Sequence, residues 1–312
     1  MSSATNAEGG PTAAFDIPDY DVDATLGCGQ AFRWEPVEGA WEGVVSGRWV
    51  RVESTPTGIR ASCLGDPDGW GWVRHHLALD EDLAAILGTF PSDPPMRAAV
   101  DACRGLRLLR QEPWECLASF ICSSTKQIVQ IRQIVRELAG AFGEPVAAPA
   151  DRGPVHAFPG PAALASAGEA ALRACRLGFR APYLLDAAER VVDGRLDLEA
   201  VGRMPTVEAR EALMSVDGVG PKVADCVLLF AYGRQDAFPI DVWVRRALAE
   251  LYFPKAGRLT PERLARFSAG HFGPYGGYAQ QYLFHHIRLR AGRVGPTPTA
   301  RVTPTGGSVG GR

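Results

Sequence analysis

The residues with the clearest capacity for chemistry lie in the second half of the chain, around a short glycine turn. Gly218, Val219 and Gly220 follow a helical pattern that ends near Met214, and Pro221 with Lys222 predicts the start of the next helix. The two glycines permit positive φ and close approach of another backbone, while the new helix start presents free N–H groups. The segment at about 211–230 therefore predicts a helical hairpin that seats a phosphate, although glycine turns between helices are also common elsewhere.

Two residues next to this turn could carry out covalent chemistry. Lys222 lies four residues before Cys226, so both share one helix face. An uncharged lysine amine can attack carbon and form a Schiff base, and the partial positive charge of a helix N-terminus disfavours its protonated form. Asp241 lies two residues after Pro239 and is predicted to cap the next helix. Its carboxylate could also stabilise a cationic transition state and move protons. A surface lysine and a purely structural cap are the plainer alternatives.

Composition limits the class of protein. The chain has 312 residues, of which 46% are hydrophobic and 22% charged, which is enough to bury two or three domain cores. No apolar run reaches the roughly 18–20 residues of a membrane span, and the N-terminal segment lacks the features of a secretory signal. The seven cysteines of the chain form no CxxC pair, so we expect reduced thiols in an intracellular compartment. The histidines lack metal-site spacing, and we expect neither a metal nor a cofactor.

Charge is distributed unevenly along the chain. Residues 1–100 carry 6 basic and 15 acidic side chains, a net charge of −9, so residues 101–312 carry 27 and 20, a net charge of +7. A polyanion would bind the second part. Only Lys126, Lys222 and Lys255 among the 33 basic residues are lysines, and arginine does not give up its proton. Each lysine is therefore a candidate for a chemical role that arginine cannot fill.

The hydrophobic pattern predicts an α+β protein. Short strands separated by turns are indicated between about 26 and 64, including residues 30–34 and the alternating run 48–53. From about residue 80 the period becomes helical, with Asp80 and Pro113 at predicted helix starts. We expect an N-terminal antiparallel sheet domain and then a mostly α-helical body. The predicted boundaries are a disordered tail at 1–13, the sheet domain at 14–104, the helical body at 105–292 and a disordered tail at 293–312.

Several motifs occur in one order over residues 15–290. They are GCGQAFRW at 27–34, RLLRQ at 107–111, FICSS at 120–124, LGFR at 177–180 and GGYAQQYLF at 276–284. With the glycine hairpin, the lysine after it and the downstream P-x-D, the sequence resembles the 8-oxoguanine DNA glycosylase/AP lyase branch of the helix-hairpin-helix DNA glycosylases. The resemblance implies base excision repair of duplex DNA that contains an oxidised purine, by a monomer that binds no membrane.

The resemblance also assigns roles to individual residues. Lys222 would attack the sugar C1′, and Asp241 would be the catalytic carboxylate. A backbone carbonyl at Gly29 would accept the N7–H that distinguishes 8-oxoguanine from guanine. The flipped base would lie between Cys226 and Phe284. Gln280 would bond the base's Watson–Crick edge.

The resemblance further assigns Phe179 as the wedge that fills the duplex and Arg180 as the reader of the orphaned cytosine. This chain departs from the commonest pattern at the same place, because Thr125 and Gln130 stand where an asparagine and an arginine are common. Selection of the opposite base is therefore expected to be weak. Trp243 replaces a frequent histidine, and no phosphate contact is assigned to it.

Two other function classes are compatible with parts of the sequence. A monofunctional alkylpurine glycosylase shares the architecture but uses water and needs only the aspartate, so Lys222 argues against it. A non-catalytic DNA-binding protein could use the hairpin alone. The combination of Lys222, Cys226 and Asp241 argues against that interpretation.

Overall fold

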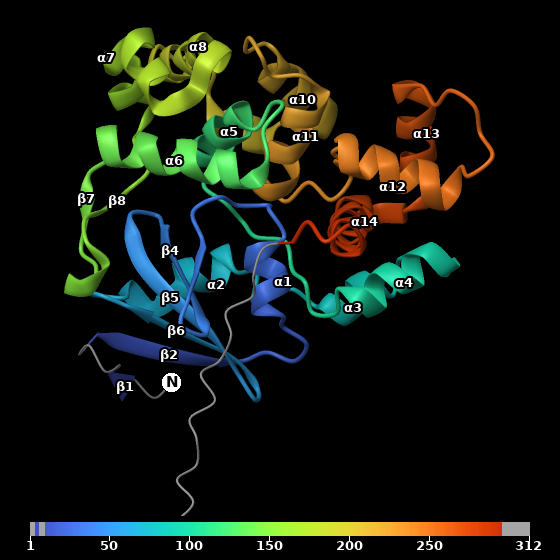
Figure 1. Cartoon of the computed structure of the whole chain (residues 1–312), viewed down its shortest axis with the longest axis horizontal. Helices are drawn as coiled ribbons and strands as arrows, with labels where there is room; N and C mark the ends of the chain where they lie inside the picture. The colour runs from blue at the N-terminus through green and yellow to red at the C-terminus, as the bar shows by residue number, and fades with distance from the viewer. Residues whose placement is uncertain (1–3, 6–9, 295–312) are drawn as a thin grey trace, which may run out of the picture.

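The protein consists of an antiparallel sheet joined to a larger helical body (Figure 1). The computed structural model describes residues 4–5 and 10–294. The predicted fold class, an N-terminal antiparallel sheet followed by a mostly helical body, is confirmed. The predicted C-terminal tail falls outside the described residues apart from positions 293 and 294.

The sheet contains six strands in the order β1-β2-β6-β5-β4-β3, each antiparallel to its neighbours. The alternating run 48–53 lies in β5 as predicted, with Val50 and Val52 buried and Arg51 half-buried. The strands are β1 (Ala4–Thr5), β2 (Pro11–Asp16), β3 (Glu35–Val37), β4 (Ala40–Val45), β5 (Arg48–Thr55) and β6 (Gly58–Cys63), and a separate pair is formed by β7 (Pro145–Val146) and β8 (Val155–His156).

Two predictions about the N-terminal part are wrong. Residues 11–13 of the predicted tail belong to β2, because Thr12 and Ala13 pair with Ser62 and Ala61 and are buried. Residues 4–5 form β1, while 1–3 and 6–9 lie outside the described residues. Residues 30–34 form no strand, since the side chain of Gln30 holds this segment by bonds to backbone groups of distant residues.

Of the two helix starts predicted in this region, the one at Pro113 is confirmed and the one at Asp80 is displaced. Glu112 caps the helix that begins at Pro113, as predicted for that proline. Asp80 caps nothing and pairs with Arg74, while Asp82 caps the helix two residues later than predicted. The helices are α1 (Val22–Gly27), α2 (Gly71–His76), α3 (Leu83–Leu87), α4 (Pro94–Ala102), α5 (Pro113–Cys122), α6 (Ile128–Phe142), α7 (Pro161–Leu172), α8 (Ala181–Val192), α9 (Leu198–Arg203), α10 (Thr206–Met214), α11 (Pro221–Phe230), α12 (Val242–Tyr252), α13 (Pro261–His271) and α14 (Gly276–Arg290).

Two hydrophobic cores meet at the extended segment 106–111. Leu106 and Leu108 belong to the helical core and Leu109 to the core beneath the sheet. Helices α3 and α4 precede this segment, yet Met96 of α4 is fully buried in the helical core, and α4 packs against α14. The two cores therefore do not divide the chain at residue 104, where the sequence places the boundary.

Gln30 fastens the two parts together. Its side chain is 1% exposed, and its Nε2 donates to the carbonyl oxygens of Thr25 and Arg107 at 2.8 Å each. Its Oε1 accepts the Leu109 N–H at 2.9 Å, and its own carbonyl accepts Nε2 of Gln111 at 2.7 Å. A buried amide with its bonds satisfied fixes the segment that carries Gly29 against the helical body.

Candidate active site

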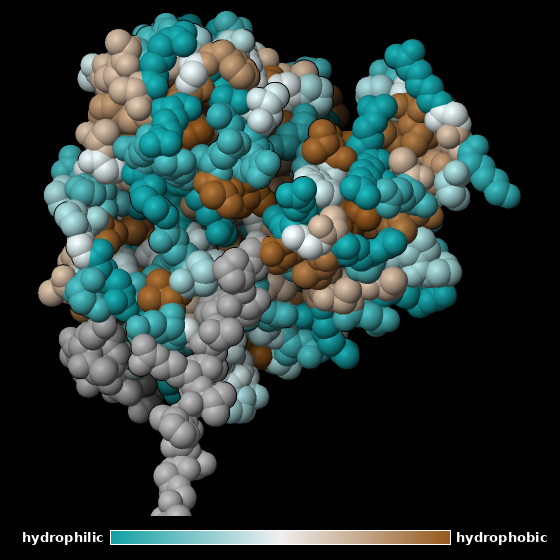
Figure 2. All heavy atoms as spheres, viewed as in Figure 1, coloured by the Kyte–Doolittle hydropathy of each residue, from teal (hydrophilic) through white to brown (hydrophobic). Residues whose placement is uncertain are grey.

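A deep cleft of about 1320 Å³ opens where the helical body meets the segment around Gly29. Its walls come from the α5–α6 connection, from α11, from the start of α12 and from α14. Figure 2 shows apolar residues gathered along the hollow between the upper body and the arm formed by α12 and α13. Of the predicted site residues, the cleft is lined by Gly29, Thr125, Lys222, Cys226, Asp241, Gln280 and Phe284.

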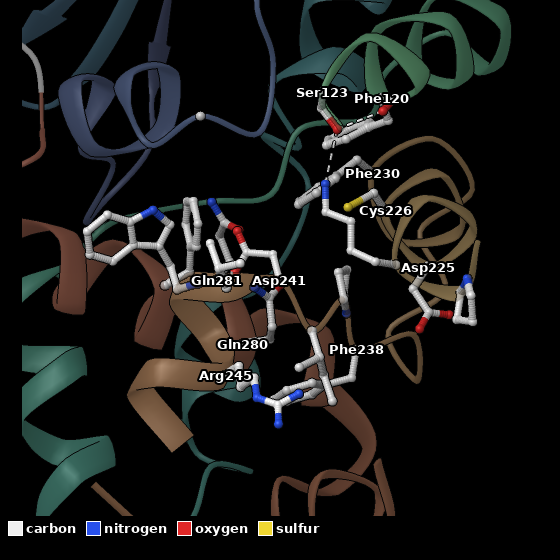
Figure 3. A pocket seen from close by; sticks show the side chains of 18 of the residues that line it. Phe120, Ser123, Asp225, Cys226, Phe230, Phe238, Asp241, Arg245, Gln280 and Gln281 are labelled. Carbon is white, nitrogen blue, oxygen red and sulfur yellow. Dashed lines mark hydrogen bonds between the residues drawn. The ribbon is translucent and has the colours of Figure 1, made fainter. Parts of the chain in front are cut away.

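The Lys222 amine is held by residues from the end of α5. Nζ donates to Ser123 Oγ at 3.2 Å, and that hydroxyl donates in turn to the carbonyl of Phe120 at 2.6 Å. Nζ also lies 5.0 Å from the centroid of the Phe120 ring, a distance at which a cation is attracted to an aromatic face. Figure 3 shows Ser123 and Phe120 facing Cys226 and Phe230 of α11. The contacts place the amine in the cleft rather than in solvent.

Asp241 occupies the N-cap of α12, as predicted from the sequence. Its Oδ1 accepts the backbone N–H of Trp243 at 2.9 Å and of Val244 at 2.8 Å. Burial raises the pKa of this carboxyl, while the two backbone bonds and the positive charges of Lys222 and Arg288 act in the opposite direction. Oδ2 accepts no hydrogen bond among the described residues. The group can therefore serve as a cap and still present negative charge.

Gly29 lies in a conformation that favours glycine. Its φ is +90°, and a Cβ placed there would lie 2.2 Å from Cδ1 of Ile128. The carbonyl of the preceding Cys28 accepts Nη1 of Arg288 at 2.9 Å, which fixes the peptide that leads into Gly29. The backbone, rather than a side chain, therefore lines this part of the cleft.

One face of α14 supplies the opposite wall. Gln280, Phe284 and Arg288 are spaced four residues apart, and the Arg288 guanidinium carbon lies 5.2 Å from the Phe284 ring centroid. Gln280 is 3% exposed, yet its Oε1 has no hydrogen-bond partner among the described residues. Across the cleft, on α11, burial raises the pKa of the Cys226 thiol to about 12 despite the nearby Lys222 amine, so the sulfur is an uncharged part of the lining.

Sequence reasoning missed two residues of the site. Arg288 continues the four-residue spacing of Gln280 and Phe284, and that spacing could have revealed it. Ser123 belongs to the FICSS motif, but its bond to Lys222 joins residues that are 99 positions apart. No local signal marks such a contact.

Phe179 and Arg180 do not line the cleft, and their side chains differ in exposure. Phe179 is 53% exposed, as a wedge requires, whereas Arg180 is 2% exposed. Arg180 Nε donates to the Ser124 carbonyl at 2.8 Å, and Nη1 donates to the Leu177 carbonyl at 3.1 Å. Nη2 donates to Oγ1 of Thr125 at 2.6 Å. The structure thus brings Arg180 and Thr125 together, but it turns the guanidinium inward.

The glycine hairpin lies beside the cleft between α10 and α11. Gly218 has φ +80°, and a Cβ there would lie 2.5 Å from the Tyr183 ring. Val219 is buried, and its N–H donates within the turn to the carbonyl of Val216 at 3.1 Å. Gly220 is the N-cap of α11, no side chain caps this helix, and no atom lies within 4 Å of the position that a Cβ on Gly220 would occupy.

The described residues contain neither a candidate metal site nor a candidate membrane span. No group of three or more His, Cys, Asp or Glu side chains in this part of the chain could hold a metal ion. None of the described helices combines the length and apolar character needed to cross a membrane.

Comparisons with known proteins identify the family. Residues 14–117 match the 8-oxoguanine DNA glycosylase N-terminal domain, and residues 118–269 match the HhH-GPD superfamily of base excision DNA repair proteins. The chain is 30% identical over 302 residues to a probable N-glycosylase/DNA lyase of Methanothermobacter thermautotrophicus, covering 87% of this chain and 95% of the relative. It is 29% identical over 282 residues to N-glycosylase/DNA lyase OGG1 of Arabidopsis thaliana, covering 85% and 77%.

Solved structures show the same relationship. The structure of MBOgg1 in complex with a low-affinity DNA ligand is similar with a TM-score of 0.85 and 34% identity, covering 93% of this chain and all of that one. The Clostridium acetobutylicum 8-oxoguanine glycosylase/lyase, in complex with double-stranded DNA containing cytosine opposite 8-oxoguanine, has a TM-score of 0.86 and 29% identity, covering 93% and 99%. The fold and the cleft thus define a helix-hairpin-helix DNA glycosylase. Within this superfamily, the chain belongs to the 8-oxoguanine DNA glycosylase/AP lyase family.

The open surroundings of Gly220 generate a prediction. Gly220→Ala adds a methyl group at the N-cap of α11 without a clash, because no atom lies within 4 Å of the new Cβ. We expect binding to damaged and undamaged duplex to weaken equally, by about 0.5–1.5 kcal/mol, since backbone bonds to phosphate carry no sequence information. Fluorescence anisotropy with both duplexes measures this. Gly218→Ala should add a loss of stability, and a Gly220→Ala defect confined to damaged DNA would contradict the phosphate-seat role.

Proposed function

We propose that this protein excises 8-oxoguanine from duplex DNA and then cleaves the abasic strand through a Schiff base on Lys222. The observation that carries the proposal is the placement of the Lys222 amine and the Asp241 carboxylate in one cleft with Gly29 and Gln280. The names of the relatives, N-glycosylase/DNA lyase, support both activities. All the residues proposed to act in the reaction come from one chain, so the proposed chemistry needs no second copy.

The geometry supports a division of roles in the chemical steps. After losing its proton, the Lys222 amine attacks C1′, the bond from C1′ to N9 breaks, and the departing base takes the electron pair and the proton that the alkylated nitrogen releases. Positive charge develops on the sugar, and the Asp241 carboxylate stabilises it. Ring opening gives the imine, after which loss of a C2′ proton expels the 3′ phosphate and cuts the strand. Ser123 orients the amine, because its own proton is committed to the Phe120 carbonyl.

The remaining cleft residues support recognition of an oxidised guanine. A flipped base would lie between the neutral Cys226 thiol and the Phe284 ring. The Gln280 Oε1 is buried without a partner, which costs about 1–3 kcal/mol and favours a ligand that brings an N–H donor. Guanine and 8-oxoguanine both offer such donors on the Watson–Crick edge. At N7 only 8-oxoguanine carries a hydrogen, and the backbone around Gly29 would accept it.

The role of Arg180 as a reader of the opposite cytosine has less support. A guanidinium has five N–H donors, and four of those of Arg180 are already bonded to Ser124, Leu177 and Thr125. Gln130 uses its side-chain oxygen to accept the N–H of Gln127 at the start of α6. Arg180, the one matched reader with a charged fork of donors, is thus largely committed to bonds within the protein, which favours weak discrimination among opposite bases.

The proposed Schiff base is tested by trapping. Borohydride should reduce the imine and leave a covalent complex between the protein and DNA containing 8-oxoguanine. Lys222→Gln should abolish trapping and strand cleavage while lesion binding stays measurable, because binding rests on other residues. Lys255→Gln is the matched control, since Lys255 is exposed and does not line the cleft. Undiminished trapping in Lys222→Gln would refute the assignment of the nucleophile.

The proposed role of Asp241 is tested by an isosteric change. Asp241→Asn keeps an oxygen for the N–H groups of Trp243 and Val244 but removes the negative charge. We expect excision to fall at least about a hundredfold with little change in the free energy of unfolding. Single-turnover excision and urea denaturation measure the two effects. Asp82→Asn, at the N-cap of α3, is the control that should leave excision intact; near-normal excision in Asp241→Asn would make Asp241 a cap only.

The commitment of Arg180 to internal bonds yields a prediction about specificity. Each base-edge contact that is lost relaxes discrimination by about 1–3 kcal/mol. We therefore expect excision of 8-oxoguanine opposite cytosine within roughly tenfold of excision opposite thymine or guanine, a spread of about 1.4 kcal/mol. Single-turnover rates opposite all four bases measure it. A preference for cytosine of about a hundredfold or more would show that Arg180 leaves its internal bonds to read the base.

A further inference from the structure

Two of the three lysines in the chain line the same cleft, and the proposed chemistry uses only one of them. Lys126 lines the cleft together with Lys222, whereas Lys255 lies elsewhere. Both cleft lysines are tied to Ser123. The Lys126 backbone N–H donates to the Ser123 carbonyl at 3.1 Å, and the Lys222 amine donates to the Ser123 hydroxyl at 3.2 Å. Lys126 therefore has a fixed backbone position next to the proposed nucleophile.

The turn that carries Lys126 has a strained backbone. Thr125, the residue before it, has φ +57°, a left-handed conformation that is a genuine outlier for a β-branched residue. Such strain costs of order 1–3 kcal/mol and persists only where surrounding bonds enforce it. The segment from Ser123 to Gln127, called here the braced turn, connects α5 to α6.

Arg180 supplies the bonds that enforce this conformation. Its guanidinium donates from Nε and Nη2 to the carbonyl of Ser124, and Nη2 also donates to Oγ1 of Thr125 at 2.6 Å. Nη1 donates to the carbonyl of Leu177 at 3.1 Å, which anchors the guanidinium in the segment before α8. The side chain is 2% exposed, so these bonds are protected from water.

The charge of Lys126 is not neutralised within the described part of the chain. Its side chain is half-buried at the cleft and makes no ion pair with a described residue. Arg210, another cation on the cleft wall, is paired with Asp225 at 2.7 Å. A half-buried lysine on the cleft wall without a carboxylate partner favours an anionic ligand.

We propose that Lys126 binds a backbone phosphate of the DNA and that Arg180 is a positioning residue, which holds the braced turn through Ser124 and Thr125. The inference rests on the proposed function, since it takes lesion-containing duplex DNA as the ligand. It differs from the hairpin contact in kind. Neutral N–H groups bind phosphate at the hairpin, whereas Lys126 brings a full charge whose binding releases a counterion from DNA.

The salt dependence of affinity tests the charge. In a Lys222→Gln background, which prevents cleavage, the dissociation constant for a duplex with 8-oxoguanine opposite cytosine is measured from about 50 to 200 mM salt. Each phosphate neutralised contributes about −0.9 to the slope of log K against log salt. Lys126→Gln should reduce the magnitude of the slope by about 0.9 and weaken binding roughly five- to tenfold near 0.1 M salt. Lys126→Arg should keep the slope, and Lys255→Gln is the matched control that should not change it.

A double-variant cycle tests the positioning role. Arg180→Met releases the turn, so it should reduce the slope as Lys126→Gln does, and the two changes together should have no larger effect than either alone. Additive losses would overturn the positioning role. An unchanged slope in Lys126→Gln, with a steep slope in the parent, would overturn the Lys126 contact while leaving the proposed function intact. A parent protein that binds the lesion duplex no better than undamaged DNA would instead contradict the proposed function.

Discussion

The side chain of Gln30 is the connection on which the site depends. The cleft takes Gly29 from the segment after α1 and all its other predicted residues from the helical body. Cys28 and Phe32, on either side of Gly29, pack into the helical core, and Gln30 bonds the backbone at Arg107 and Leu109, where the two cores meet. A buried amide that loses one of these partners leaves a polar group unsatisfied, at a cost of about 1–3 kcal/mol. The relative position of Gly29 and the α14 wall is therefore set by this packing and by a few hydrogen bonds, including those that Gln281 and Arg288 of α14 donate to Cys28, rather than by a continuous sheet or helix.

The sequence predicts those elements of the fold whose signals are local. Pro113 at the first helical position, the cap at Asp241 and the glycine turn before Pro221 each specify their conformation within a few residues. Where the sequence-based prediction is wrong, contacts with residues far away along the chain determine the local structure. Residues 30–34 have the pattern of a strand, but Gln30 bonds residues 77 and 79 positions away instead of entering the sheet. Helix α4 follows the sheet in sequence yet packs on α14, because its apolar face fits the helical core.

The same distinction applies to the site. Lys222 and Asp241 stand out in the sequence because each lies at a predicted helix start close behind a proline, Pro221 for the lysine and Pro239 for the aspartate. Ser123 and Arg180 acquire their contacts only in three dimensions, since their partners lie 99 and 55 to 56 positions away in Lys222, Thr125 and Ser124. Residue type alone does not reveal the surroundings of Arg180. Its position in the sequence matches a base reader, whereas in the structure its side chain is buried and bonded to Ser124, Leu177 and Thr125.

The seven cysteines bear on how the protein tolerates oxidants. All are free and buried, and burial raises the pKa of every one, including Cys226 in the cleft wall. Peroxides and disulfides react with the thiolate and not with the thiol, so both the protonation state and the limited access protect these sulfurs. An enzyme that removes oxidised guanine must work while the cell is under attack by the agents that create the lesion. Burial in the hydrophobic cores keeps its free thiols protonated and so lowers their reactivity towards these oxidants.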